Sequence, residues 1–535
     1  MRLIRRNVSE SRDETAEPRL QRTTRSLPEW FEANRVQGQT RLHIHPWLTR
    51  GEFAEAAAGF KALGAGAFGR HVKSGHEDPW WPTAAPLAPD GRPLSDRDRT
   101  IDGEFVARGR NIAQEVMDEA HAEGLRIVTY YWHMTEKTFE DPEPEWVCKD
   151  EKGDPIVGPR GIYLDITGPY REVVRTRLLE LAEMGADGFF FDYRHLPPRG
   201  AWGSALEDAW KAETGEEAAP PQDETDSRYR QFIDFKAKKI EETFAYWRDE
   251  VKAAHPEVVF LISVTTVPAL TDREMTTRLV RIADSPKNEY RHALSPNFSK
   301  KVFETHPKLA PEGHVRQAVG WAVLRDSADG RPPHIWAPGL PNSDHAKAFA
   351  ASLLTFGCIA NMDVADGSVR QREDPPPGKT PLDAVEAAFA LGAIASPHLA
   401  GTRPVRWAAV HFGERSRNAR GNDYRAAWEE VLWPFVGPFQ VLSEDGLPVG
   451  IVNDDQLAQG ELDGYRLLVL SNLDELTAAQ QQAVRAFKAR RGAVIESDPA
   501  WAWSDPDRRP SAAAAFRAVI RPGLASAPVR VTGGT

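Results

Sequence analysis

The sequence has only two cysteines, Cys148 and Cys358, among its 535 residues. Two cysteines cannot form a disulfide framework or a zinc site built on cysteine. No apolar run approaches the ~18 residues that span a bilayer, so no membrane partner is expected. The chain also lacks a basic stripe, because 67 Lys and Arg stand against 78 Asp and Glu for a net charge of −11. This acidic balance argues against a nucleic-acid partner.

The N-terminal segment lacks the hydrophobic stretch of an export signal. Arg2, Arg5 and Arg6 are followed by a polar stretch up to Arg25. An export signal needs an apolar segment of ~7–15 residues after its charged start. We therefore expect residues 1–34 to form a flexible arm on a cytoplasmic protein.

Residues 35–402 alternate short apolar runs with helical patterns, which favours parallel βαβ units. The apolar runs predict eight strands, at Arg41–His45, Gly66–Val72, Arg126–Trp132, Gly188–Asp192, Val258–Val264, Leu279–Asp284, Pro333–Trp336 and Cys358–Asp363. Val315–Leu324 competes with Pro333–Trp336 for the seventh strand. The 3.6-residue pattern predicts helices that include Phe53–Leu63, Ile112–Glu123, Tyr170–Met184, Phe232–Ala254, His345–Phe356 and Leu382–Ser396. This count is that of an α/β fold of the TIM type, a (β/α)8 barrel.

A second, smaller unit is expected at residues 403–510. Its order of elements is typical of a flavodoxin-like, doubly wound sheet: strand Trp407–Phe412, helix Asp423–Val436, strands Pro448–Val452 and Tyr465–Leu470, helix Thr477–Arg490 and strand Ala493–Glu496. No G-x-G-x-x-G follows its first strand, so nothing marks a nucleotide site and no cofactor is expected. Residues 511–535, rich in Ala, Pro and Gly, are expected to form a tail.

The run Gly188–Asp192 carries the most informative residue. Three consecutive phenylalanines predict a buried strand, and Asp192 follows them at the strand's exit. Active sites of such barrels lie at the carboxyl ends of the strands, and burying an uncompensated charge is costly. Asp192 is therefore expected to face a polar cleft as a catalytic carboxylate, or else to pair with Arg194 or a neighbouring strand.

Two further acids, Asp284 and Glu289, lie at the end of the predicted sixth strand. Strands four and six flank the barrel mouth, so these carboxylates can face Asp192 across it. The alternative is that Asp284 caps a turn and that Glu289 is solvated.

Polar and aromatic residues gather near the other strand ends. Sixteen tryptophans against ten tyrosines favour flat platforms that stack on sugar rings, although a loop tryptophan can equally be a packing residue. The candidate substrate-binding residues are His43, His45, Arg70, His71, Trp81, Tyr131, His133, Arg194, His195 and Trp336. His43 and His45 share one face of their strand and suit a barrel metal site. The predicted fifth and sixth strand ends carry no histidine, so no metal is predicted.

These segments together resemble glycoside hydrolases built on (β/α)8 barrels. His71–Trp81 and Gly124–Tyr131 are similar to the second-strand loop and third strand of the α-L-fucosidase family. Asp187–Asp192 resembles the fourth-strand motif that carries the aspartate nucleophile there and in α-amylase-like enzymes. Trp407–Glu496 resembles the trimerisation domain of family 42 β-galactosidases, and the whole chain is most similar to hypothetical glycosyl hydrolase groups related to these families. The resemblance implies a carbohydrate substrate, Asp192 as nucleophile and a homo-oligomer, either a dimer or a trimer.

The sequence thus predicts a retaining glycosidase. Asp192 attacks the anomeric carbon, and Glu289, or else Asp284, protonates the leaving oxygen. Two alternatives stay open. One is a metal-dependent, amidohydrolase-like enzyme that uses His43 and His45, and the other is a non-catalytic carbohydrate-binding relative of an enzyme.

Overall fold

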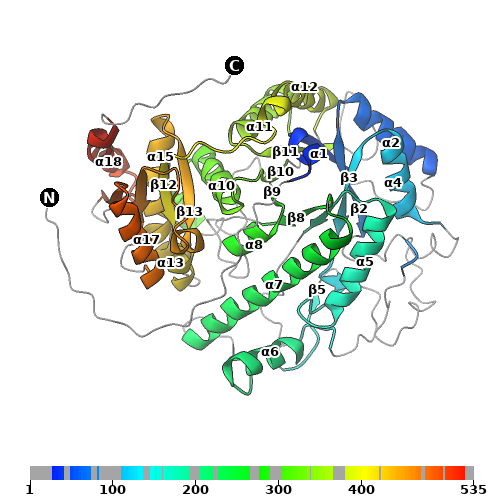
Figure 1. Cartoon of the computed structure of the whole chain (residues 1–535), viewed down its shortest axis with the longest axis horizontal. Coiled ribbons are helices and arrows are strands. Elements are labelled where there is room, and N and C mark those ends of the chain that lie inside the picture. The colour runs from blue at the N-terminus through cyan, green and yellow to red at the C-terminus, as the bar shows by residue number, and fades with distance from the viewer. Residues whose placement is uncertain are drawn as a thin grey trace.

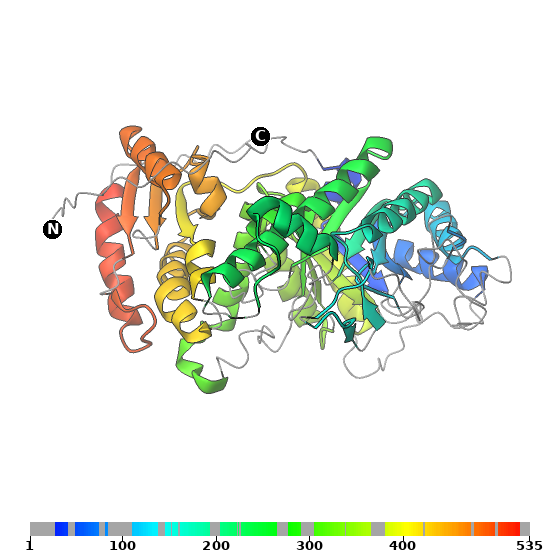
Figure 2. The same cartoon turned by 90° about the horizontal axis from the view of Figure 1, so that it is seen from below.

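The computed structural model contains a closed barrel and a smaller parallel sheet beside it (Figures 1 and 2). It describes residues 27–40, 49–73, 81–83, 110–136, 145–150, 152–158, 161–192, 204–221, 223, 226–264, 276–289, 304–337, 339–364, 380–420, 423–471, 476–497 and 501–524.

Eight parallel strands close the barrel. Each strand pairs with the next along the chain, and β1 pairs with β11 to complete the ring. The predicted (β/α)8 barrel is therefore confirmed. Its strands are β1 Val36–Thr40, β2 Ala67–Lys73, β3 Arg126–Tyr131, β7 Gly188–Phe191, β8 Val259–Ser263, β9 Ser285–Glu289, β10 His334–Ala337 and β11 Ile359–Val364.

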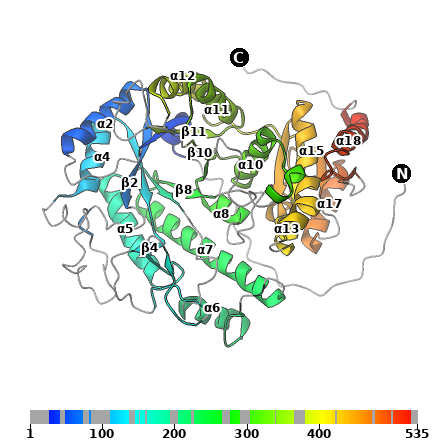
Figure 3. The ribbon, with the colours of Figure 1, turned by 180° about the vertical axis from the view of Figure 1, so that it is seen from behind.

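Helices cover the outside of the barrel (Figure 3). They are α2 Arg50–Ala62, α4 Ile112–Ala122, α5 Tyr170–Met184, α6 Ser204–Thr214, α7 Ser227–Ala254, α8 Thr277–Ile282, α10 Gly313–Ser327, α11 Ser343–Thr355 and α12 Leu382–Leu399. After β3, the strands β4 Thr135–Glu136, β5 Val157–Gly158 and β6 Gly161–Tyr163 form a small antiparallel sheet. Helix α5 begins and ends at the residues predicted for it, Tyr170 and Met184. Among the described helices, none combines the length and apolar character needed to cross a membrane.

One of the predicted strands was wrong. The apolar run Leu279–Asp284 is mostly helix α8, and the sixth strand is the polar segment that follows, Ser285–Glu289. This strand contains Pro286, Lys287 and Asn288, so its composition is that of a loop. The described first strand is Val36–Thr40, and the predicted strand Arg41–His45 lies outside the described part of the chain. Val315–Leu324 falls within α10 and is not a strand.

The last part of the expected N-terminal arm is folded. Helix α1, Glu29–Ala33, follows Leu27, and both Leu27 and Phe31 are buried. They pack against Val259 and Ile359, which point into the barrel near the amino ends of their strands. The amino end of the barrel is thus closed by the chain that leads into its first strand.

The smaller sheet is doubly wound, as predicted. Its four parallel strands lie in the order β13-β12-β14-β15, with β12 Ala408–Phe412, β13 Val449–Asn453, β14 Leu467–Leu470 and β15 Ala493–Glu496. One face packs against α10 of the barrel together with α15 (Trp433–Glu444) and α18 (Arg509–Leu524). The other face packs against α16 (Asp454–Ala458) and α17 (Ala478–Ala489). Between β12 and α15 lie α13 (Glu414–Ala419), α14 (Tyr424–Ala426) and a π-helical segment, Ala427–Leu432.

Part of the expected C-terminal tail is also folded. Residues 511–524 belong to α18, whose Phe516 is fully buried and contacts Trp501 and Trp503 edge-on. The high alanine content, from which a tail was expected, is also typical of a helix, because alanine has the highest helix propensity. Residues 525–535 lie outside the described part of the chain.

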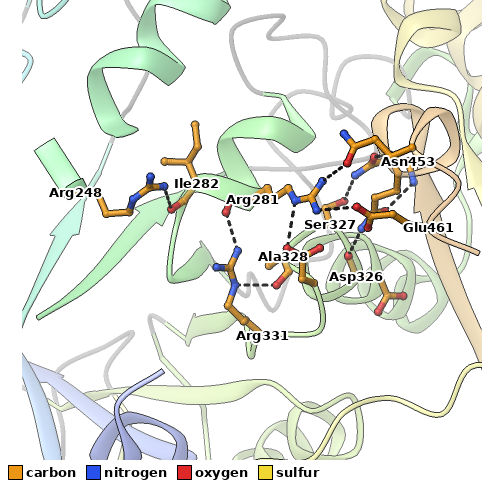
Figure 4. Close-up of polar contacts among 12 residues, drawn as sticks. Arg248, Arg281, Ile282, Asp326, Ser327, Ala328, Arg331, Asn453 and Glu461 are labelled. Atoms are coloured by element: carbon orange, nitrogen blue, oxygen red, sulfur yellow. Dashed lines mark hydrogen bonds and ion pairs between the residues drawn. The ribbon is translucent and has the colours of Figure 1, made fainter. Parts of the chain in front are cut away.

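The two units share helix α10 and a set of polar contacts between them (Figure 4). The Arg281 guanidinium binds the Glu461 carboxylate at 2.8 Å, and the Asn453 side chain donates to the Ser327 hydroxyl at 3.2 Å. The backbone amide of Ile451 donates to Asp326 at 2.8 Å. Apolar packing and satisfied polar groups therefore hold the units together.

Glu414 is a buried carboxyl group at this junction. It accepts hydrogen bonds from the backbone amide and hydroxyl of Thr277, at 3.1 and 2.8 Å. Burial raises the pKa of Glu414 to about 7, although Arg417 and Arg278 act in the opposite direction. The ordinary pKa of this carboxyl is 4.5, so the folded chain binds the proton more tightly than the unfolded chain does. Stability from this group is therefore complete below pH 4.5 and declines as the pH rises to about 7.

We expect Phe31→Ala to lower the free energy of unfolding by about 3–5 kcal/mol, because it removes a fully buried ring from the closed end of the barrel. Chemical denaturation measures this loss. Val157→Ala is the control, since Val157 is 69% exposed and its truncation should leave stability nearly unchanged. Equal effects of the two substitutions would mean that α1 does not close the barrel.

We expect Glu414→Gln to flatten the pH dependence of stability. Between pH 4.5 and 7 the wild-type chain should lose up to about 3 kcal/mol relative to this variant, which has no proton to release. Denaturation at several pH values across this window gives the difference. Glu444→Gln is the control because Glu444 is half exposed. A stability difference that stays constant across the window contradicts the prediction.

Candidate functional site at the carboxyl end of the barrel

The register of the strands fixes which interior side chains lie at one height. In an eight-stranded barrel of shear eight, the register climbs by one residue at each strand, so one layer contains side chains from alternate strands. From β11 to β9, Asn361 pairs with Trp336, and Trp336 pairs with Glu289. Glu289 is thus linked through Trp336 to Asn361, and two steps between strands account for a climb of two residues. Glu289 therefore lies at the same height as Asp363, which is two residues beyond Asn361.

The same reasoning places Asp192 in this layer. From β9 to β8, Lys287 pairs with Ser263. The pairing of β8 with β7 ends at Ile262 and Phe191, which sets Ser263 beside Asp192. Asp192 is thus linked through Ser263 to Lys287, again with a climb of two residues over two strands. It therefore lies at the height of Glu289, which is two residues beyond Lys287.

Three carboxylates thus form one layer at the barrel mouth, and we call Asp192, Glu289 and Asp363 the acid layer. Their inward direction follows from Phe190, Lys287 and Asn361, which line a cavity inside the barrel. Residues two further along a strand point to the same face. Asp363 is buried, whereas Asp192 and Glu289 are partly exposed.

The side chain of Asp192 points into the barrel. The Tyr130 hydroxyl, on β3, donates to its Oδ2 at 3.3 Å. Tyr130 itself lines the interior cavity, so Asp192 faces the barrel axis and not the surrounding helices.

The layers beneath the acid layer are polar. Tyr130, Gln39, Ser263 and Trp336 lie in the next layer by register, followed by Phe190, Lys287, Asn361 and Gly69. Six of these eight residues, all except Ser263 and Trp336, line a cavity of about 10 Å³ inside the barrel together with Gln37, Val128 and His334.

Hydrogen bonds hold this polar interior in place. Gln39 Oε1 accepts from Lys287 Nζ at 2.6 Å and from Asn361 Nδ2 at 2.9 Å. His334 Nε2 lies 3.2 Å from Gln37 Oε1, an oxygen that can only accept, so Nε2 carries the proton. Burial, and to a smaller extent the Lys287 charge, lowers the pKa of His334 well below its ordinary value. His334 is therefore neutral at pH 7.

Asp284 does not belong to the site. It precedes β9 and so lies at the amino end of the barrel, where it is 1% exposed. It binds Lys252 at 2.9 Å and accepts the backbone amide of Phe260 at 2.9 Å. Its interpretation as a catalytic acid was wrong because the sixth strand begins where the sequence suggested that it ended.

Three predicted substrate-binding residues face away from the barrel axis. Tyr131 is fully buried in the layer between strands and helices, on the opposite face from Tyr130. The His133 ring packs against Phe244 and Trp247, with centroids 5.4 and 5.7 Å away, on the helix side of the barrel wall. Trp81 is 2% exposed and donates to Glu180 of α5 at 2.8 Å.

Trp336 faces the interior directly beneath the acid layer and is 5% exposed. Its role in substrate binding stays a prediction. His43, His45, Arg194 and His195 lie outside the described residues, as do the side chains of Arg70 and His71. By its strand position, residue 71 occupies the β2 place nearest the acid layer.

Sequence reasoning missed the polar interior residues Gln37, Gln39, Lys287, His334 and Asn361. A signal was present, because polar residues recur two apart in three of the strands: Gln37 and Gln39, Lys287 and Glu289, and Asn361 and Asp363. This spacing puts both members of each pair on one face.

Among the described residues, no group of three or more His, Cys, Asp and Glu side chains is arranged to hold a metal ion. A cavity of about 520 Å³ lies at the junction of the two units. Each of its three acids has a basic partner: Asp329 and Glu461 bind Arg281, at 3.2 and 2.8 Å, and Asp326 binds Arg325 at 2.8 Å.

The fold has relatives among solved β-galactosidases. The enzyme from the psychrophilic Marinomonas ef1 aligns with a TM-score of 0.58 at 14% identity, over 86% of this chain and 75% of that chain. The cold-adapted enzyme from Rahnella sp. R3 aligns with 0.61 at 12% identity, over 87% and 71%. A GH42 β-galactosidase from G. stearothermophilus gives 0.56 at 11% identity, over 87% and 71%. Neither a protein-family model nor a curated protein matches the sequence.

At these identities the likeness shows the fold alone. The aligned share, 86–87% of this chain, is longer than either unit alone. The fucosidase resemblance stays a prediction.

We expect Asp284→Asn to lower the free energy of unfolding by about 3–5 kcal/mol, because it leaves Lys252 without its carboxylate. Asp192→Asn should cost about 1 kcal/mol or less, since Asp192 is partly exposed at the mouth. Denaturation of the two variants side by side compares a structural aspartate with a site aspartate. The reverse order of stabilities would contradict their placement at opposite ends of the barrel.

Proposed function

We propose that this protein is a glycoside hydrolase acting on an oligosaccharide or small glycoside. The observation that carries the proposal is the acid layer, with carboxylates from strands four and six at one height around the mouth of a barrel. Glycoside hydrolysis needs a pair of carboxyl groups on either side of the scissile bond. The likeness of the fold to β-galactosidases supports the proposal by analogy.

Asp192 is the nucleophile and Glu289 the acid/base in this proposal. Asp192 attacks the anomeric carbon while the glycosidic C–O bond breaks, and Glu289 gives its proton to the leaving oxygen. Glu289 then takes a proton from water, whose oxygen attacks the anomeric carbon and releases Asp192. The hydrogen bond from Tyr130 to Asp192 suits a carboxylate that has to stay ionised.

The strand spacing is compatible with a retaining mechanism. One strand lies between β7 and β9, so their backbones are about 9–10 Å apart. Both side chains point toward the axis, which brings the carboxyl groups closer than the backbones. Retention requires a separation of about 5–5.5 Å, and inversion about 6.5–9.5 Å. Trp336, which lies directly below the layer and is 5% exposed, would form part of the floor of the substrate site.

The assembly and the compartment belong to the same proposal. The second unit resembles a trimerisation domain, so we propose a homo-oligomer of two or three chains. We propose a cytoplasmic location.

The test is hydrolysis of a panel of nitrophenyl glycosides by the wild-type protein and its variants. We expect Asp192→Asn to lower kcat by at least about 10³-fold. Glu289→Gln should lower kcat most for substrates with poor leaving groups, which need a proton. Asp463→Asn is the control because Asp463 lies in the second unit and is 70% exposed. Full activity of Asp192→Asn, or glycan binding without any cleavage by the wild-type protein, would overturn the proposal.

The stereochemistry of the product separates retention from inversion. NMR of the first-formed sugar should give the same anomer as the substrate. With Asp192→Ala, added azide should restore cleavage and yield a glycosyl azide of the opposite configuration, because a small anion can replace the missing nucleophile. An inverted product from the wild-type protein would make Asp192 a base rather than a nucleophile.

A further inference from the structure

Lys287 is a buried cation on the axis of the barrel. It extends inward from β9 and is 3% exposed. Its Nζ donates to Gln39 Oε1, on β1, at 2.6 Å. The same nitrogen lies 3.4 Å from the centroid of the Phe190 ring, on β7. Contacts with two other strands of the barrel, β1 and β7, place the ammonium in its interior, just beneath the acid layer.

The described groups around this ammonium are neutral, except for the acid layer. Gln39 and Asn361 carry no charge, His334 is neutral at pH 7 for the reasons given above, and Tyr130 donates a hydrogen bond. A buried charge is costly unless an opposite charge compensates it. Among the described interior residues, opposite charge is available from Asp192, Glu289 and Asp363, in the layer directly above.

We propose that Lys287 is a positioning residue for the acid layer and that it holds Asp192 in the ionised form. This inference rests on the proposed function, in which Asp192 has to be ionised while Glu289 carries the proton. Lys287 supplies the asymmetry between two carboxyl groups that share one layer. It touches no reacting atom and acts through the electric field of its charge.

Asp192 is the partner because of where the lysine side chain points. Lys287 and Glu289 share strand β9, but the Lys287 side chain leaves this strand and reaches the ring of Phe190. Asp192 follows β7 directly and is two residues beyond Phe190, so the alternation of side chains puts it on the same face, one layer above the ring. The ammonium thus lies between Gln39 of β1 and the ring beneath Asp192.

A double-mutant cycle on stability tests the coupling without any substrate. Lys287→Met removes the charge and keeps most of the volume. We expect its loss of thermal stability to be larger at pH 7 than at pH 4, where the carboxylates begin to take up protons. In an Asp192→Asn background at pH 7, this loss should fall by at least half. In Glu289→Gln and Asp363→Asn backgrounds it should stay close to its full size.

Two results would overturn the proposal. One is an equal loss of thermal stability on Lys287→Met in the Asp192→Asn and wild-type backgrounds. The other is a loss that becomes smaller only in the Glu289→Gln or Asp363→Asn background. If Lys287→Met does not fold, Lys287→Gln takes its place in the cycle. Lys287→Arg keeps the charge and should keep the pH dependence that Lys287→Met loses.

A second arm uses turnover. In Lys287→Met, the acidic limb of the profile of kcat/KM against pH should move upward by about one pH unit or more, and Lys287→Arg should move it back. A merely structural lysine would lower kcat/KM equally at all pH values. If no glycoside is cleaved but the stability cycle finds the coupling, the proposed function fails while the pairing of Lys287 with Asp192 stands.

Discussion

The closure of the barrel with a fixed stagger is the constraint on which the site depends. Eight strands can close only if each is offset from its neighbour, and this offset converts a position along a strand into a height along the barrel axis. Asp192, Glu289 and Asp363 are far apart in the sequence and come from three alternate strands. They share a layer because the register of the strands places all three at the same height along the barrel axis.

The same constraint gives the two ends of the barrel different chemistry. At the amino end, Phe31 closes the interior and each aspartate has a basic partner: Asp284 binds Lys252, and Asp187 binds Arg126 and His121. Toward the carboxyl end the interior becomes polar, with a hydrogen-bonded set built on Gln39 and Lys287. Polar groups inside a barrel cost apolar burial, and here they are stabilised by hydrogen bonds to one another.

The sequence was sufficient for the architecture and only partly sufficient for the site. Helix α5 was predicted at both ends because its apolar periodicity is clear and Gly185, at φ 112°, ends it. Strand β9 was missed because a strand whose one face lines a polar cavity has a loop-like composition. In β3, both faces are buried, so alternation could not say whether Tyr130 or Tyr131 points inward. Trp81 could not be placed from sequence, since its partner Glu180 lies 99 residues away.

The second unit has a structural role that its own geometry supports. Doubly wound sheets bind ligands in the crevice at the carboxyl ends of their strands. Here the Asp454 carboxylate, just after β13, binds His411 at 3.0 Å and Gln480 at 2.8 Å. Glu414, just after β12, binds Thr277 of the barrel. In the described part of this crevice, the carboxylates bind side chains of the chain itself. Helix α10 packs against the second sheet through one set of side chains and against the barrel through Trp321 and Leu324, so this helix joins the two units.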